Sequence, residues 1–171
     1  MASINIRAFR SPDAAGVRDL FIRVNRALAP DGMAEAFEAY IARSLEEEID
    51  RVETYFAERR GAFFVAESTG TIVGMFGLED AGSGAAELRR MYVDPDRRGL
   101  GLGRQLLDMS ERAARDMGFM RMILSTSELQ GAALALYRTA GYTETHEEVA
   151  TAASNKTLGG GLRRFHFEKV L

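Results

Sequence analysis

The chain has 171 residues, of which 46% are hydrophobic and 27% charged, and this is the balance of one globular domain. Its formal net charge of −3 argues against a protein that binds nucleic acid or a membrane through excess positive charge. The lack of cysteine excludes disulfides, thiolate nucleophiles and Cys-ligated metals, and two histidines are too few for a His-rich metal site. Of the 22 basic residues, only Lys156 and Lys169 are lysines.

The first part of the chain predicts one strand and two helical regions. Residues 3–8 alternate apolar and polar side chains, which is typical of a strand. Ser11-Pro12-Asp13 supplies an N-cap, a first-turn proline and a carboxylate, so a helix is expected to follow and to continue to Leu28. A second helical region is predicted over residues 33–59, as one helix or two.

The rest of the chain predicts six strands and two helices. The strands are expected over residues 62–67, 71–79, 87–93, 120–125, 142–145 and 163–170, and the helices over 102–117 and 130–140. A turn is expected at 80–84 and a long loop at 147–161, which is polar and ends in three glycines. This order predicts a single α/β domain over residues 1–171 with a mixed sheet.

A glycine-rich turn over residues 93–104 is the most informative segment, because it connects a predicted strand to an amphipathic helix. Glycines at alternate positions let main-chain N–H groups approach a ligand closely. The N-terminus of the following helix favours an anion by about 0.3–1 kcal/mol, and nearby arginines add positive charge. The glycines are Gly99, Gly101 and Gly103, and the arginines are Arg97, Arg98 and Arg104. A phosphate site is predicted here, and the alternative is a plain loop with solvated arginines.

Two common phosphate motifs do not fit this turn. A P-loop requires Gly-Lys-Ser/Thr, whereas Gly103 is followed by Arg104. A dinucleotide fingerprint requires a third glycine at a position held by Arg104, counted from Gly99, or by Leu106, counted from Gly101. The next predicted strand also ends at Ser125 rather than at an acidic residue. The turn is therefore neither an NTPase nor a Rossmann signature.

The turn and a downstream segment together resemble the GNAT superfamily of acyl-CoA-dependent N-acyltransferases. Arg98-x-x-Gly101-x-Gly103 is similar to the family's pyrophosphate motif, and the preceding segment 91–95 resembles the exit of its central strand. Residues 133–142, with Leu-Tyr followed by Gly and an aromatic, resemble its second signature. The resemblance covers roughly residues 63–142. It implies a GNAT-like fold with a mostly antiparallel, twisted sheet flanked by helices.

The resemblance also implies a cosubstrate, acetyl-CoA or another acyl-CoA. The pyrophosphate is expected on the main-chain N–H groups of the turn, and the pantetheine arm along the central strand as an added strand. The implied cofactor-binding residues are Met91, Tyr92, Val93, Arg98, Gly99, Leu100, Gly101, Leu102, Gly103, Arg104 and Gln130. Gln130 departs from the family, which often has Asn at the start of this helix.

Transfer to an amine requires removal of a proton. An alkyl ammonium with a pKa near ~10.4 is neutral in about one molecule in 2,500 at pH 7, which corresponds to roughly 4.6 kcal/mol. Glu87 is the predicted general base, because a glutamate at the same position in the central strand serves as base in the histone-acetyltransferase branch of the family. The alternative is a carboxylate at the end of the strand that lies in solvent or pairs with Arg89 or Arg90. Other candidate bases are Glu79, Glu128, His146 and an ordered water.

Tyr137 is the predicted general acid. Its place in the Leu-Tyr signature implies that it stabilises the departing CoA thiolate, whereas an aromatic in a helix would otherwise be core packing. Ser125 and Ser127 suggest an acyl-serine route, but the sequence places no histidine to activate them. Direct attack on the thioester in a ternary complex is the simpler mechanism.

The sequence therefore predicts an N-acetyltransferase that uses acetyl-CoA and a small-molecule or peptide primary amine. The alternative is a non-catalytic acyl-CoA-binding sensor or regulatory module, which would keep the turn and lose the proton-transfer groups. No metal, nucleic-acid or membrane partner is expected. The sequence does not decide whether the chain forms a homodimer. The N-terminus lacks the apolar run of a signal peptide, which predicts a cytoplasmic location. The acceptor is expected to contact residues 24–37 and 147–161.

Overall fold

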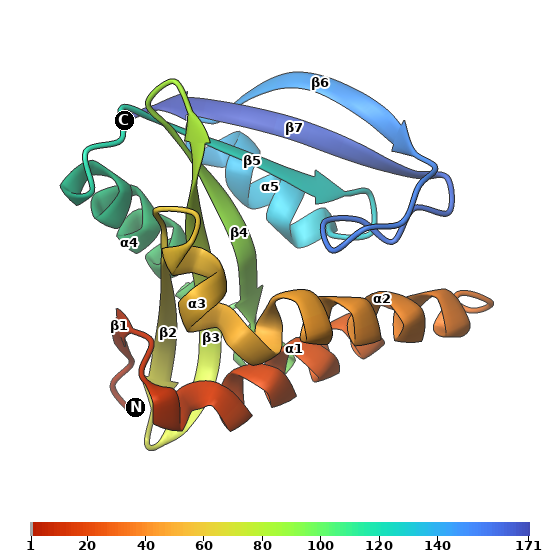
Figure 1. Cartoon of the computed structure of the whole chain (residues 1–171), viewed down its shortest axis with the longest axis horizontal. Coiled ribbons are helices and arrows are strands. Elements are labelled where there is room, and N and C mark those ends of the chain that lie inside the picture. The colour runs from red at the N-terminus through yellow and green to blue at the C-terminus, as the bar shows by residue number, and fades with distance from the viewer. Residues whose placement is uncertain (1) are drawn as a thin grey trace.

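The computed structural model describes residues 2–171 and has one seven-stranded sheet in the order β1-β2-β3-β4-β5-β7-β6 (Figure 1). Every neighbouring pair is antiparallel except β4 and β5, which run parallel. This confirms the predicted α/β class with a mixed, mostly antiparallel sheet. The strands are β1 (Asn5–Ala8), β2 (Ala62–Ser68), β3 (Thr71–Gly82), β4 (Ala85–Val93), β5 (Arg121–Ser127), β6 (Thr143–Ala150) and β7 (Leu162–Val170).

Helices pack on both faces of the sheet, and each face has its own core. One core joins the sheet to α1 (Ala14–Leu28), α2 (Ala34–Glu47) and α3 (Val52–Ala57), and the other joins it to α4 (Leu102–Asp116) and α5 (Gly131–Thr139). Because both faces of β3 are covered, residues 72–79 are buried without interruption. Gly77 is needed there, since a Cβ would lie 2.5 Å from the Phe56 ring. No helix in the described chain has the length and apolar content required to cross a membrane.

The two parallel strands separate soon after they meet. Their pairing extends only from Ala85 opposite Arg121 to Glu87 opposite Ile123. Beyond that point β4 stays paired with β3 alone and β5 with β7 alone, and Figure 1 shows the two strands moving apart. One edge of β4 therefore presents main-chain N–H and C=O groups without a strand partner, and an extended ligand can pair with such an edge.

A β-bulge lies in the separated part of β4. Tyr92 pairs with Met75 and Arg89 with Gly77, so two β4 residues face one residue of β3. Arg90, in the bulge, has a φ of +55°, a left-handed conformation that costs a non-glycine residue about 1–2 kcal/mol. The bulge alters the direction of the β4 side chains next to the gap.

Several element boundaries differ from the sequence prediction. β6 continues beyond residue 145 to Ala150 because residues 147–150 pair with β7, so the predicted loop at 147–161 is shorter at its start. β3 continues to Gly82, which shortens the predicted turn at 80–84. The region 33–59 holds two α-helices separated by a 3₁₀ turn. The N-cap before the 3₁₀ turn that precedes α1 is Arg10 rather than Ser11.

Candidate active site

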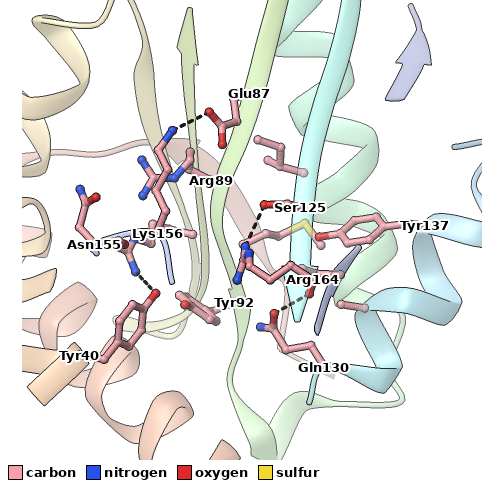
Figure 2. Close-up of a pocket in the computed structure, with 15 residues that line it drawn as sticks. Tyr40, Glu87, Arg89, Tyr92, Ser125, Gln130, Tyr137, Asn155, Lys156 and Arg164 are labelled. Carbon is pink, nitrogen blue, oxygen red and sulfur yellow. Dashed lines mark hydrogen bonds and ion pairs between the residues drawn. The ribbon is translucent and has the colours of Figure 1, made fainter. Parts of the chain in front are cut away.

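Two pockets meet at the gap between β4 and β5, and both are lined by Met91, Tyr92, Gln130 and Ala133. The first has a volume of about 260 Å³ and reaches the glycine-rich turn before α4. We call it the turn pocket. The second has a volume of about 90 Å³ and is lined by charged side chains, including Glu87, Arg89, Lys156 and Arg164 (Figure 2). We call it the charged pocket. A ligand in one pocket can reach the other because they share these residues.

The turn pocket presents main-chain donors at its glycine-rich end. Gly99 and Gly101 have φ values of +75° and +80°, and a Cβ at either position would meet no atom within 4 Å. The N–H groups of Gly99, Leu100 and Gly101 donate to no backbone acceptor in the described chain. The first N–H groups of α4, which starts at Leu102, have no intrahelical acceptor either. The donors and the open space both fit a phosphate group.

The turn is fixed at its beginning by Asp94. The Asp94 carboxylate accepts the N–H of Asp96 at 3.0 Å and pairs with Arg23 of α1 at 3.1 Å. Burial raises the pKa of this carboxyl, but the hydrogen bonds from Arg23 and Asp96 outweigh burial, so the pKa is lowered. Asp94 is therefore ionised at neutral pH and connects the turn to α1.

The structure brings together most of the residues implied for cofactor binding. Those that line the turn pocket are Met91, Tyr92, Val93, Arg98, Gly99, Gly101, Leu102, Gly103 and Gln130. Leu100 and Arg104 do not line it. The Leu100 side chain is 56% exposed, and the Arg104 side chain pairs with Asp108 at 3.0 Å. Only the main chain of these two residues remains part of the turn.

Helix α5 contributes Gln130 and Tyr137. Gln130 is the N-cap residue of α5, and its side-chain oxygen accepts a hydrogen bond from Thr126. Tyr137 is buried against Tyr142 and Phe167, and Figure 2 shows its hydroxyl directed into the charged pocket. Burial raises the pKa of Tyr137 above its ordinary value, and the neighbouring Tyr92 raises it further. Tyr137 is therefore a protonated donor at neutral pH.

Glu87 lines the charged pocket, but its partner is not one of the arginines considered from the sequence. Its carboxylate lies 2.9 Å from Lys156 Nζ, and Glu79, the cross-strand neighbour of Glu87, lies 3.1 Å from the same atom. Burial raises the pKa of Glu79, but the charges of Arg89 and Lys156 outweigh this and lower it. Burial lowers the pKa of Lys156, and the hydrogen bond and charge of Glu87 reverse this and raise it. Glu79 and Lys156 thus favour their charged forms.

The other two candidate bases lie outside the charged pocket. The Glu128 carboxylate accepts the main-chain N–H of Arg163 at 3.0 Å. His146 stacks on His166, with ring centroids 4.1 Å apart, and His166 lies 2.9 Å from Glu148. His166 is the cross-strand neighbour of Ser125, but the Ser125 hydroxyl accepts a hydrogen bond from Arg164. Among residues 2–171 no hydrogen bond joins this serine to a histidine.

A buried charge network supports β4 from the side of α2 and α3. Glu48 is fully buried and accepts from Arg89 at 3.0 Å and from Arg90 at 2.6 Å. Arg89 also donates to Tyr55, and Arg90 to Tyr40. Glu48 therefore holds the bulge residue Arg90 in its left-handed conformation by an ion pair that water cannot reach.

Sequence reasoning did not single out several residues of the charged pocket, among them Tyr40, Asn155, Lys156 and Arg164. Asn155 and Lys156 belong to the segment expected as a long loop, and Lys156 joins that segment to β3 and β4 through its two ion pairs. One signal was available, because Lys156 is one of only two lysines among 22 basic residues. Nothing in the sequence marked Arg164 as a pocket residue, because an arginine in a predicted strand is usually a solvated surface residue.

The fold and the two pockets define an α/β protein whose sheet opens beside its central strand to receive an extended, phosphate-bearing ligand. The chain belongs to the acetyltransferase (GNAT) family, because the sequence pattern of that family matches residues 29–142. This confirms the family predicted from the two motifs.

Individual relatives agree with this assignment. The chain is 34% identical over 114 residues to N-acetyltransferase 8 of Rattus norvegicus, covering 63% of this chain and 51% of the relative. It is 39% identical over 83 residues to IAA acetyltransferase of Azospirillum brasilense, covering 48% of this chain and 54% of the relative. The chain spans about half the length of these curated relatives.

Solved structures share the complete fold. PaiA N-acetyltransferase of Thermoplasma acidophilum, solved in complex with coenzyme A, superposes with a TM-score of 0.73 over 99% of both chains. The sequence identity is 19%, so this likeness concerns the fold alone.

Proposed function

We propose that residues 1–171 act as one N-acetyltransferase domain, which transfers an acetyl group from acetyl-CoA to a primary amine by direct attack in a ternary complex. The observation that carries this proposal is the unpaired edge of β4, which connects the turn pocket to the charged pocket. Tyr137 lies at the end of the path where the acyl group would be.

The turn pocket would bind the nucleotide end of the cosubstrate. The free N–H groups of residues 99–101 and the start of α4 would hold the pyrophosphate, with Arg97 and Arg98 beside it. The main chain of residues 91–93 would pair with the pantetheine arm. Acetyl-CoA supplies an acyl thioester at the far end of that arm.

Tyr137 and Glu87 would carry out the proton transfers. Glu87, or the adjacent Glu79, would accept a proton from the acceptor ammonium and leave a neutral amine for the attack on the acyl carbonyl. Tyr137 would donate its proton to the departing thiolate as the carbon–sulfur bond breaks. The raised pKa keeps the Tyr137 hydroxyl protonated, so that it donates a hydrogen bond to the thiolate as the negative charge develops.

The proposal can be tested by release of free thiol from acetyl-CoA with a panel of primary amines, together with calorimetric binding of CoA. We expect CoA binding and amine-dependent thiol release. Binding of CoA without thiol release by any amine would instead indicate an acyl-CoA sensor. The charged pocket favours the enzyme over the sensor, because it retains a protonated tyrosine, Tyr137, and a carboxylate, Glu87, beside the β4 edge.

Three points remain predictions from the sequence: the cytoplasmic location, the lack of a nucleic-acid partner and the formation of a homodimer.

A further inference from the structure

Arg164 differs from the other cations of the charged pocket. Its Nη2 donates to the Ser125 hydroxyl at 2.8 Å, and it forms no ion pair with any carboxylate of residues 2–171. The side chain extends from β7, and Figure 2 shows its guanidinium inside the pocket. It also lines the two cavities that adjoin the charged pocket on this side. The hydrogen bond to Ser125 uses one of the five N–H donors of the guanidinium, and the others can bind a ligand.

The neighbouring cations are all neutralised. Arg89 pairs with Glu48 and Glu79, Arg90 pairs with Glu48, and Lys156 pairs with Glu79 and Glu87. Among the cations that line the described pocket, Arg164 is therefore the one without an ion pair to a carboxylate. Burial lowers the pKa of Arg164, which shows that water solvates this cation poorly. A guanidinium remains charged nonetheless, so an anionic ligand would gain from pairing with it.

The opposite side of the charged pocket already holds a primary ammonium. Lys156 Nζ lies between the Glu79 and Glu87 carboxylates, at 3.1 Å and 2.9 Å. An acceptor ammonium can take the place of Lys156 as the partner of Glu87, which lines the pocket. The pocket thus offers a carboxylate for an ammonium and a guanidinium without an ion pair for an anion. Its volume of about 90 Å³ suits a small molecule.

We propose that the acceptor is a small amine that also carries a carboxylate, such as a free amino acid, and that Arg164 binds this carboxylate. Arg164 is then a specificity-determining residue, while the acceptor amine lies toward Glu87. A planar guanidinium can hold a carboxylate by two parallel hydrogen bonds, which gives direction as well as charge. This inference rests on the proposed acetyl transfer for the fate of the amine, but the carboxylate site can be tested without turnover.

The test is calorimetric titration of the wild-type protein, saturated with CoA, with three N-acetyl amino acids and their primary amides. The probes are derivatives of alanine, methionine and phenylalanine, which sample three side-chain sizes. We expect at least one acid to bind at least tenfold more tightly than its own amide. Equal affinities within all three pairs would overturn the proposal.

Two variants assign the effect to Arg164. Arg164→Gln should remove the preference for the acid, and Arg164→Lys should restore only part of it, because a lysine keeps the charge and loses the fork. Arg163→Gln is the matched control. It makes the same charge change on the neighbouring β7 residue, whose side chain is 55% exposed and pairs with Glu128 and Glu147 at 3.9–4.0 Å. The Arg163→Gln protein should keep the preference, and thermal unfolding of each variant shows that it is folded.

Thiol release separates this inference from the proposed function. Amino acids should be acetylated with a lower KM than their amides in the wild type, and Arg164→Gln should raise KM for the acids more than it lowers kcat. Efficient acetylation of the amides and the acids alike would overturn the carboxylate site while supporting acetyl transfer. Acid-selective binding that depends on Arg164, without thiol release from any amine, would support the site and contradict the proposed function.

Discussion

The turn pocket and the charged pocket meet at the same strand but are built in different ways. The turn pocket is formed mainly by one continuous segment, residues 91–103, together with the start of α5, and most of its polar groups belong to the main chain. The charged pocket is formed by side chains from α2, β4, β5, α5, β7 and the segment after β6. Its chemistry depends on the identity of each of those side chains.

This difference bears on what each pocket can select. A pocket made of main chain binds any ligand that carries the right phosphates and amide groups, so it suits a common cosubstrate. A pocket made of charged side chains selects a particular acceptor. Substitutions in the charged pocket should therefore change turnover and acceptor choice, and they should leave CoA affinity nearly unchanged.

The largest effect is expected from Tyr137→Phe, which removes one hydroxyl and keeps the ring packing against Tyr142 and Phe167. We expect kcat to fall by ~10²–10⁴ with little change in CoA affinity, because the donor to the departing thiolate is lost. Steady-state kinetics and calorimetry measure the two quantities. Tyr142→Phe is the control, since the Tyr142 hydroxyl bonds to Glu111 away from both pockets. An unchanged kcat in Tyr137→Phe, with acyl transfer rate-limiting, would leave Tyr137 as a core residue.

A second effect concerns the support beneath β4. Glu48→Gln leaves Arg90 buried without a carboxylate in the described chain, and loss of one partner of a buried ion pair costs about 3–5 kcal/mol. Denaturant unfolding should show this loss. Glu38→Gln is the matched change in α2, where Glu38 pairs with Arg26 at the surface, and it should alter stability little. A Glu48→Gln protein as stable as the wild type would show that the network is not needed to hold the bulge.

A smaller effect is expected from Glu87→Gln, because Glu79 lies beside Glu87 and can accept a proton in its place. With a strongly basic amine, kcat/KM at pH 7 should fall by about tenfold or more. The loss should shrink as the pH rises toward the amine's pKa, since more of the amine is then neutral and needs no base. Glu128→Gln should follow the wild-type pH profile. A Glu87→Gln profile that overlays the wild type would assign the proton transfer to Glu79 or to water.

The sequence predicted the order of the elements and most of the turn pocket, because both depend on local patterns. Alternation, helical spacing and the glycines at 99, 101 and 103 act over a few residues and can be recognised in one segment. The charged pocket could not be predicted to the same extent, because its residues come from distant parts of the sequence. Tyr40 and Arg164 are more than a hundred positions apart. Only folding of the sheet brings them together. For the same reason the alternative partners considered for Glu87, Arg89 and Arg90, did not include Lys156, which approaches from the segment after β6.

The most direct measurement is calorimetric titration of CoA into Gly101→Ala and Gly118→Ala. Both glycines have left-handed φ values, +80° and +91°, with no atom within 4 Å of an added Cβ, and they lie at opposite ends of α4. The backbone strain is thus matched, and only Gly101 lines the turn pocket. We predict at least tenfold weaker CoA binding, about 1.4 kcal/mol, in Gly101→Ala and wild-type binding in Gly118→Ala. Equal, undiminished CoA affinity in both folded variants would contradict the placement of the cosubstrate on this turn.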